Sequence, residues 1–82
     1  MIKNSIRVKL NSMKDVALFI ERCSLFDVDI DYQVDRYVID AKSLMGILSI
    51  SLGKEATVTI NTEDRRMIDT FIDELQLWSV EE

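Results

Sequence analysis

Ser43 is the residue of this sequence whose type and position could most readily do chemistry. Ser43 follows Lys42 and directly precedes the apolar segment 44–52. A serine at the start of a helix accepts a hydrogen bond from a first-turn amide, and the positive end of the helix dipole also favours a phosphate there. Two interpretations therefore stay open for Ser43: a capping hydroxyl that stabilises the helix by about 1 kcal/mol, and an acceptor of a regulatory phosphate.

The segment after Ser43 is apolar around more of its circumference than one buried face requires. At 100° per residue its apolar side chains cover roughly 220°, whereas a stripe that faces a core needs about 100°. Exposed apolar patches with a polar rim typically mark interaction sites, and methionine suits an adaptable surface. We predict that at least two of Leu44, Met45 and Leu48 lie outside the core and that the three bind a protein partner.

Three aspartates, Asp27, Asp29 and Asp31, suggest a metal site at first sight. A calcium-binding EF-hand loop that began at Asp27 would need glycine where Tyr32 stands and glutamate where Val38 stands. The alternation with apolar residues instead predicts a strand with the three carboxylates on its solvent face. Their mutual repulsion would discourage association of sheet edges.

Cys23 is the only cysteine, and the sequence contains no histidine. Because Cys23 shares a helical stripe with Val16 and Phe19, we expect a buried structural thiol with no basic partner to lower its pKa. We expect Trp78 to pack back on the domain. The sequence has no phosphate-binding loop, no nucleophile–base set and no metal-ligand spacing, so we predict no enzyme activity, no cofactor and no metal.

Composition narrows the class of protein further. The chain has 82 residues, 48% of them hydrophobic and 30% charged, with a net charge of −5. This is the composition of one small globular domain, 1–82, and an acidic chain with scattered lysines lacks the basic surface that nucleic acids or anionic lipids require. No apolar run reaches the length of a membrane span and no signal peptide precedes residue 6, so we expect a cytoplasmic protein.

The elements that position these residues follow from periodicity. Period-two alternation predicts strands, and apolar residues spaced three and four apart predict helices. Asn11 or Ser12 is expected to cap the first helix, Ser43 the second, which would run to about Leu52 and stop at Gly53, and Thr62 the third. The order is β-α-β-β-α-β-α, an α+β open-faced sandwich with the helices on one face of an antiparallel sheet. The strands are predicted at 6–10, 26–32, 36–40 and 56–60.

The segment 42–46, Lys-Ser-aliphatic-Met-Gly, followed by aliphatic residues and Ser49, resembles the regulatory-serine helix of HPr. HPr is the small phosphocarrier of the bacterial sugar phosphotransferase system. Segments 27–40, 55–60 and 63–75 resemble the central hairpin, last strand and closing helix of that family. The resemblance implies a sheet of strand order 1-4-2-3, phosphorylation of Ser43 by a dedicated kinase, and partner docking through Leu44, Met45 and Leu48.

One departure from the family decides the function. HPr-type carriers pass phosphate through the histidine of a Gly-aliphatic-His-Ala-Arg-Pro segment, and the corresponding segment here, 11–16, is shorter and has no imidazole. Within this former phosphocarrier region, Ser12 is better explained as a helix cap than as an acceptor, and Lys14 is the only remnant of the arginine. Asp15, near the place of the proline, would repel phosphate. Because the sequence contains no histidine, the histidine carrier reaction is excluded.

We interpret the chain as a non-catalytic HPr-like regulatory or interaction module, closest in type to the catabolite-repression form of HPr. That form lacks the histidine but keeps the serine. The implied partner is a protein: a transcriptional regulator, a kinase or a phosphotransferase-system component. The chain itself would be a monomer or a weak homodimer. Two alternatives stay open: a small-molecule-sensing regulatory domain, although 10–15 lacks the glycine turn such sites commonly use, and a purely structural subunit of a larger assembly.

Overall fold

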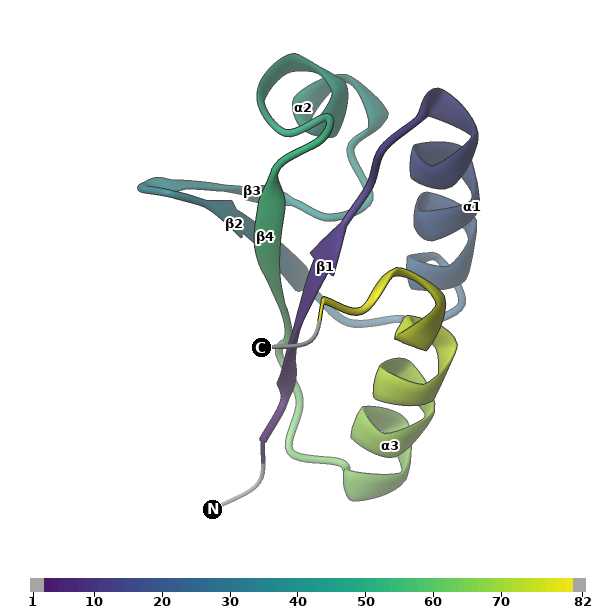
Figure 1. The fold of residues 1–82 in the computed structure, drawn as a ribbon. Helices are drawn as coiled ribbons and strands as arrows, with labels where there is room; N and C mark the ends of the chain where they lie inside the picture. The colour runs from purple at the N-terminus through teal and green to yellow at the C-terminus, as the bar shows by residue number, and fades with distance from the viewer. Residues whose placement is uncertain (1–2, 81–82) are drawn as a thin grey trace.

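Four strands form one antiparallel sheet in the computed structural model, which describes residues 3–80 (Figure 1). The strand order is β1-β4-β2-β3, so the predicted order 1-4-2-3 is confirmed. Residues 1–2 and 81–82, which the predicted domain 1–82 includes, lie outside the described residues. The strands are β1 (Ser5–Lys9), β2 (Ile30–Val34), β3 (Tyr37–Asp40) and β4 (Glu55–Ile60).

The helices cover one side and one end of this sheet. Figure 1 shows α1 and α3 on the same side of the sheet, with α2 at its end, next to the start of α1. This arrangement is the open-faced sandwich that the sequence predicts. The helices of the described chain are α1 (Met13–Cys23), α2 (Leu44–Ile50), α3 (Arg65–Glu74) and a final turn of 3₁₀ helix, η1 (Gln76–Trp78).

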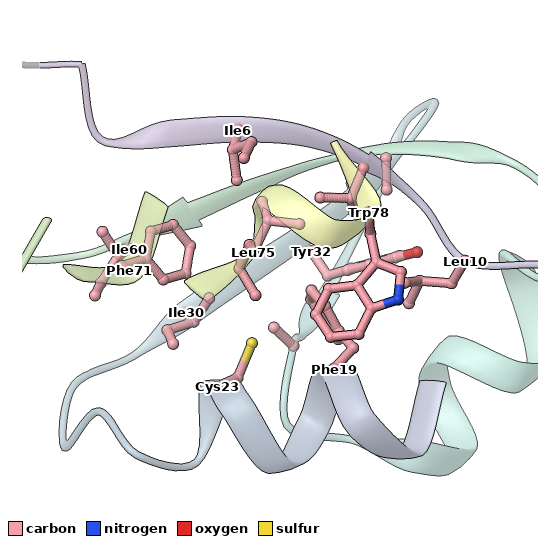
Figure 2. Close-up of a cluster of buried hydrophobic side chains, with 14 of the residues drawn as sticks. Ile6, Leu10, Phe19, Cys23, Ile30, Tyr32, Ile60, Phe71, Leu75 and Trp78 are labelled. Atoms are coloured by element: carbon pink, nitrogen blue, oxygen red, sulfur yellow. The ribbon is translucent and has the colours of Figure 1, made fainter. Parts of the chain in front are cut away.

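The core lies between the sheet and helices α1 and α3 (Figure 2). Phe19 of α1 is central, since its ring makes edge contacts with Tyr32 of β2 at 5.6 Å and with Trp78 at 5.8 Å between centroids. Edge-to-face pairs of this kind add to the stabilisation that burial gives. Trp78 thus packs on the domain, as predicted, and holds η1 against Phe19 of α1.

The strand predicted from residue 26 begins only at Ile30. The reason lies in a side chain far along the sequence: the Lys42 Nζ donates to the carbonyls of Phe26, at 2.7 Å, and Val28, at 3.1 Å. These carbonyls therefore bind a cation, and residues 24–28 turn after α1. The predicted placement of the three aspartates on one strand is wrong in consequence, because Asp27 and Asp29 precede β2 and only Asp31 lies on it. Asp27 and Asp29 are nevertheless exposed to solvent.

Two helix boundaries also differ from the prediction. Asp64, not Thr62, caps α3, because its carboxylate accepts from the amides of Arg66 and Met67. The Thr62 hydroxyl accepts instead from the Asp64 amide and so shapes the turn before the helix.

Helix α2 ends at Ile50, before the predicted Leu52. Ser51 caps it with an amide that donates to the carbonyl of Ile47, and Gly53 follows with a φ of 80°. That left-handed conformation favours glycine. It lets the Gly53 amide donate to the carbonyl of Leu10 at 2.7 Å, which joins the end of α2 to the loop before α1.

Candidate functional site

Ser43 is the N-cap of α2, as predicted. Its backbone is extended, with φ −97° and ψ 104°, and its hydroxyl accepts from the Gly46 amide at 3.2 Å. A Cβ at Gly46 would stand 3.1 Å from the Ser43 Oγ and 3.2 Å from the Ile39 Cδ1. Glycine at this position therefore leaves room for the hydroxyl to lie against the first turn, and the Ser43 side chain remains half-exposed.

The backbone before Ser43 is held by three neighbouring interactions. The Asp40 carboxylate accepts from the Lys42 amide at 2.8 Å, and the Asp40 carbonyl accepts from the Ser43 amide at 3.0 Å. The Lys42 ammonium binds the loop after α1 through the two carbonyls described above. Ser43 is thus presented on a fixed turn, and the nearest carboxylate along the chain is that of Asp40.

The apolar residues of α2 divide between core and surface. Ile47 is fully buried, and Leu48 and Ile50 are half-buried against the core. Leu44 is 45% exposed and Met45 78% exposed. The predicted exposure of at least two residues among Leu44, Met45 and Leu48 is confirmed, whereas their binding of a partner remains a prediction. We call Leu44, Met45 and Leu48 the α2 face.

Met13, at the start of α1, is an exposed apolar residue whose significance the sequence pattern did not reveal. Met13 belongs to the segment 11–16, whose polar side chains are the ones that the resemblance to HPr singles out. Figure 1 shows that the start of α1 and helix α2 lie at the same end of the molecule. Met13 and Leu52, both exposed, therefore add apolar surface at the end of the molecule that carries the α2 face.

In the former phosphocarrier segment, Ser12 and Asp15 already have hydrogen-bond partners within the protein. The Ser12 hydroxyl accepts from the Asp15 amide at 3.1 Å, and the Asp15 carboxylate accepts in return from the Asn11 amide at 3.2 Å. This reciprocal pattern is a variant of the capping box. The same carboxylate accepts from the Trp78 Nε1 at 3.4 Å, and Lys14 is exposed to solvent. Ser12 therefore acts as a predicted cap, and the Asp15 carboxylate joins the start of α1 to η1.

Cys23 is fully buried, and burial raises the pKa of its thiol to about 12. A thiol with such a pKa stays protonated at neutral pH and is a poor nucleophile, which agrees with the predicted structural role. Within residues 3–80, no group of three or more histidine, cysteine, aspartate or glutamate side chains is arranged to hold a metal ion. No helix in that part of the chain has the length and apolar character needed to cross a membrane.

A surface hollow of about 900 Å³ lies between β1 and α3. Its walls carry both signs of charge, with Lys3 on one side and Asp69 and Asp73 on the other. Because α2 contributes no residue to this hollow, a small molecule bound there would leave the α2 face free. The partner-binding and ligand-sensing interpretations can therefore be tested separately.

Comparison with known proteins assigns the family. Residues 12–76 match the family model described as the PTS HPr component phosphorylation site. This chain belongs to the HPr family. The match includes the segment that in this chain has no histidine, so the family's scaffold is present without the family's phosphate acceptor.

Individual relatives point to one branch of the HPr family. The HPr-like protein Crh of Halalkalibacterium halodurans is 32% identical over 66 residues, covering 77% of this chain and 79% of the relative. The protein of the same name from Bacillus subtilis is 30% identical over 71 residues, covering 80% and 84%. The predicted kinship with the catabolite-repression form of HPr is confirmed by these two relatives.

Solved structures agree with the fold. HPr-C-His from Thermoanaerobacter tengcongensis superposes with a TM-score of 0.68 at 26% identity, covering 93% of this chain and 92% of that one. The crystal structure of Bacillus subtilis Crh, described as a domain-swapped dimer, gives a TM-score of 0.63 at 21% identity, with coverage of 99% and 95%. The second likeness bears on the fold alone.

Proposed function

We propose that this protein is a non-catalytic regulatory module of carbon catabolite repression that binds a protein partner through the α2 face. The observation that carries the proposal is the exposure of Leu44 and Met45 on a helix that Ile47 anchors in the core. An apolar face that is held rigidly loses little conformational entropy on binding. The family assignment and the two Crh relatives support a regulatory role.

Burial of the exposed side chains of α2 would contribute substantially to the free energy of binding a partner. Full burial of a methionine or leucine side chain contributes about 1.5–3 kcal/mol. Met45 is almost wholly available for such burial, and Leu44 about half. Ser43 and Ser49 border this apolar surface, and a polar rim around an apolar centre is the usual organisation of a protein interface. The occupant is therefore a protein with an apolar pocket, in keeping with the transcriptional regulators that the family resemblance implies.

Ser43 is the residue through which such binding would be regulated. A phosphate on the hydroxyl of this half-buried residue would add about 1.5–2 negative charges at the border of the α2 face. Asp40, which shapes the turn before Ser43, already brings negative charge to this region. The combined charge would favour a partner that carries arginine or lysine next to its apolar pocket.

The phosphorylation part of the proposal is tested by incubation with an HPr-type kinase and ATP, followed by mass spectrometry of the intact chain and its peptides. One phosphate on Ser43 is the expected result, and Ser43→Ala should prevent it. Ser49 is the internal control, because it lies two turns into the same segment and its hydroxyl donates to the Gly46 carbonyl. Absence of phosphate on the wild-type chain, or its appearance on Ser49 alone, would remove the regulatory role of Ser43.

The docking part is tested with Met45→Glu and with Leu25→Glu as its matched control. Leu25 is 68% exposed, follows α1 and receives the same change in charge. Binding of the phosphorylated chain to a catabolite-repression regulator should weaken at least about tenfold for Met45→Glu, equivalent to about 1.4 kcal/mol, and remain unchanged for Leu25→Glu. Equal effects of the two variants would contradict docking through α2. Leu48 is a less suitable position, because it is half-buried against the core.

A further inference from the structure

Strand β3 presents a free edge of the sheet. It is the last strand in the order β1-β4-β2-β3 and pairs on one side with β2. Val34 and Tyr37 flank a two-residue turn, so in this hairpin they exchange both of their backbone hydrogen bonds. By alternation the amides and carbonyls of Tyr37 and Ile39 face β2, and those of Val38 point away from the sheet. The Ala41 amide, which donates to the Ile30 carbonyl at 2.9 Å, fits this alternation.

The opposite edge of the sheet, formed by β1, is covered by another segment of the chain. The outer side of β1 is covered by the segment after η1, through a bridge between Val8 and Ser79 and a hydrogen bond from the Val80 amide to the Arg7 carbonyl at 2.9 Å. No strand among residues 3–80 covers β3 in the same way. An exposed edge is a template for pairing with another strand, so β3 is the edge available to a partner.

The side chains of β3 are apolar where they are exposed. Tyr37 is 60% exposed and Val38 56% exposed. Charged residues of opposite sign border them, with Arg36 in the turn before the strand and Asp40 at its end, both exposed. In addition, Asp40 stands directly opposite Asp31 in the pairing of β2 with β3, and like charges in that relation destabilise a sheet.

We propose that β3 is a homodimer surface, where the β3 strands of two copies pair antiparallel around a two-fold axis at Val38. In this register Val38 stands opposite Val38 of the second copy, and each can donate to and accept from the other. Tyr37 stands opposite Ile39, which joins an aromatic to a β-branched residue on the helix-covered face. Arg36 stands opposite Asp40 at both ends, where its guanidinium offsets the repulsion between Asp40 and Asp31.

Charge selects this register over its neighbour. Because outward-pointing residues recur every second position, the next possible alignment shifts the partner strand by two residues. That alignment would place Val38 opposite Asp40 and would leave Arg36 without the opposite charge. A four-residue strand and a net charge of −5 make the dimer weak, so it is expected to be populated at high micromolar to millimolar concentration.

The first test is sedimentation of the wild-type chain and two charge variants over that range of concentration. Arg36→Asp should raise the dissociation constant of the dimer about tenfold, because it removes two ion pairs and creates two repulsions. Arg65→Asp is the matched control: Arg65 is also exposed, lies at the start of α3 and undergoes the same change in charge. A chain that stays monomeric at millimolar concentration, or a dimer that both variants weaken equally, would overturn the proposal.

The second test uses charge exchange between subunits. Asp40→Lys alone should also weaken the dimer, whereas a mixture of Asp40→Lys with Arg36→Asp places opposite charges at both contacts and should restore association as a heterodimer. Hydrogen exchange supplies an independent readout, since the Val38 amide should become protected only as concentration rises. A dimer in which Val38 exchanges at the same rate as in the monomer would show that the copies meet through another surface.

Discussion

Replacement of Cys23 by alanine should change how the stability of this protein depends on pH. Burial raises the pKa of the thiol from its ordinary value of 9.0 to about 12, with Lys42 opposing and Asp40 adding to the shift. Above pH 9 the unfolded chain therefore releases a proton that the native chain retains. Because the unfolded state then binds fewer protons, the free energy of unfolding falls as pH rises, through a window that opens near pH 9 and closes near pH 12.

The magnitude follows from the two pKa values. Between about pH 8 and about pH 10 the unfolded state gains about 1.4 kcal/mol from ionisation of Cys23, the equivalent of one pH unit beyond its pKa. This number depends little on the native pKa, provided that it stays above about 11. All other titratable groups are common to the wild-type chain and Cys23→Ala, so the difference between the two chains isolates Cys23.

The assay is urea denaturation of both chains at the two pH values, monitored by far-ultraviolet circular dichroism. Cys23→Ala should be less stable at about pH 8, because truncation leaves a small cavity. Its deficit should shrink by about 1.4 kcal/mol at about pH 10, since alanine has no proton to lose. A deficit that stays constant between the two pH values would refute the reasoning and indicate that the native thiol ionises like an exposed one.

Two other predictions concern stability. Ile47→Ala should lower the free energy of unfolding by about 3 kcal/mol because Ile47 is fully buried, whereas Met45→Ala should change it by less than about 0.5 kcal/mol; similar urea midpoints for the two would contradict the division of α2 between core and surface. Asp15→Ala should cost about 1 kcal/mol and lower the melting temperature by about 4–8 °C, because Asn11 and Trp78 both lose their acceptor. Thermal denaturation followed by Trp78 fluorescence checks this, and an unchanged melting temperature would show that the carboxylate does not tie η1 to α1.

Much of the fold could be predicted because its signals are local. The α1 stripe of Val16, Phe19 and Cys23 and the alternation along β4 each lie within one element, and the structure buries them as predicted. The strand order could not come from periodicity, which is blind to which strands pair. It followed only from the resemblance of the segment around Ser43 to a known family.

The errors arose where distant groups decide local structure. Alternation extends β2 back to Phe26, but the Lys42 ammonium takes the carbonyls of Phe26 and Val28, and nothing in the local pattern indicates that contact. Thr62 and Asp64 are both good caps by residue type. Only the path of the chain after β4 determines that the Asp64 carboxylate reaches the first-turn amides of α3.

The candidate site was predictable to a similar extent, and for a related reason. An apolar arc too wide for one buried face already implies exposed residues on α2, and the structure identifies them as Leu44 and Met45. The contribution of Met13 was not predictable. An isolated methionine at the start of a helix gives no periodic signal, and its significance depends on the position of α1 beside α2.

The contrast between the two helix starts indicates where binding chemistry remains in this protein. At α1, the Ser12 hydroxyl accepts from the Asp15 amide, and the Asp15 carboxylate accepts from the Asn11 amide and the Trp78 indole. At α2, the Ser43 hydroxyl accepts one hydrogen bond from the Gly46 amide, and Ser43 is half-buried beside the exposed Leu44. Under the proposed function, a partner would gain little by displacing the interactions at α1, whereas at α2 it would bury apolar area next to Ser43. The sequence has no histidine to carry phosphate, whereas Leu44 and Met45 of the α2 face are exposed.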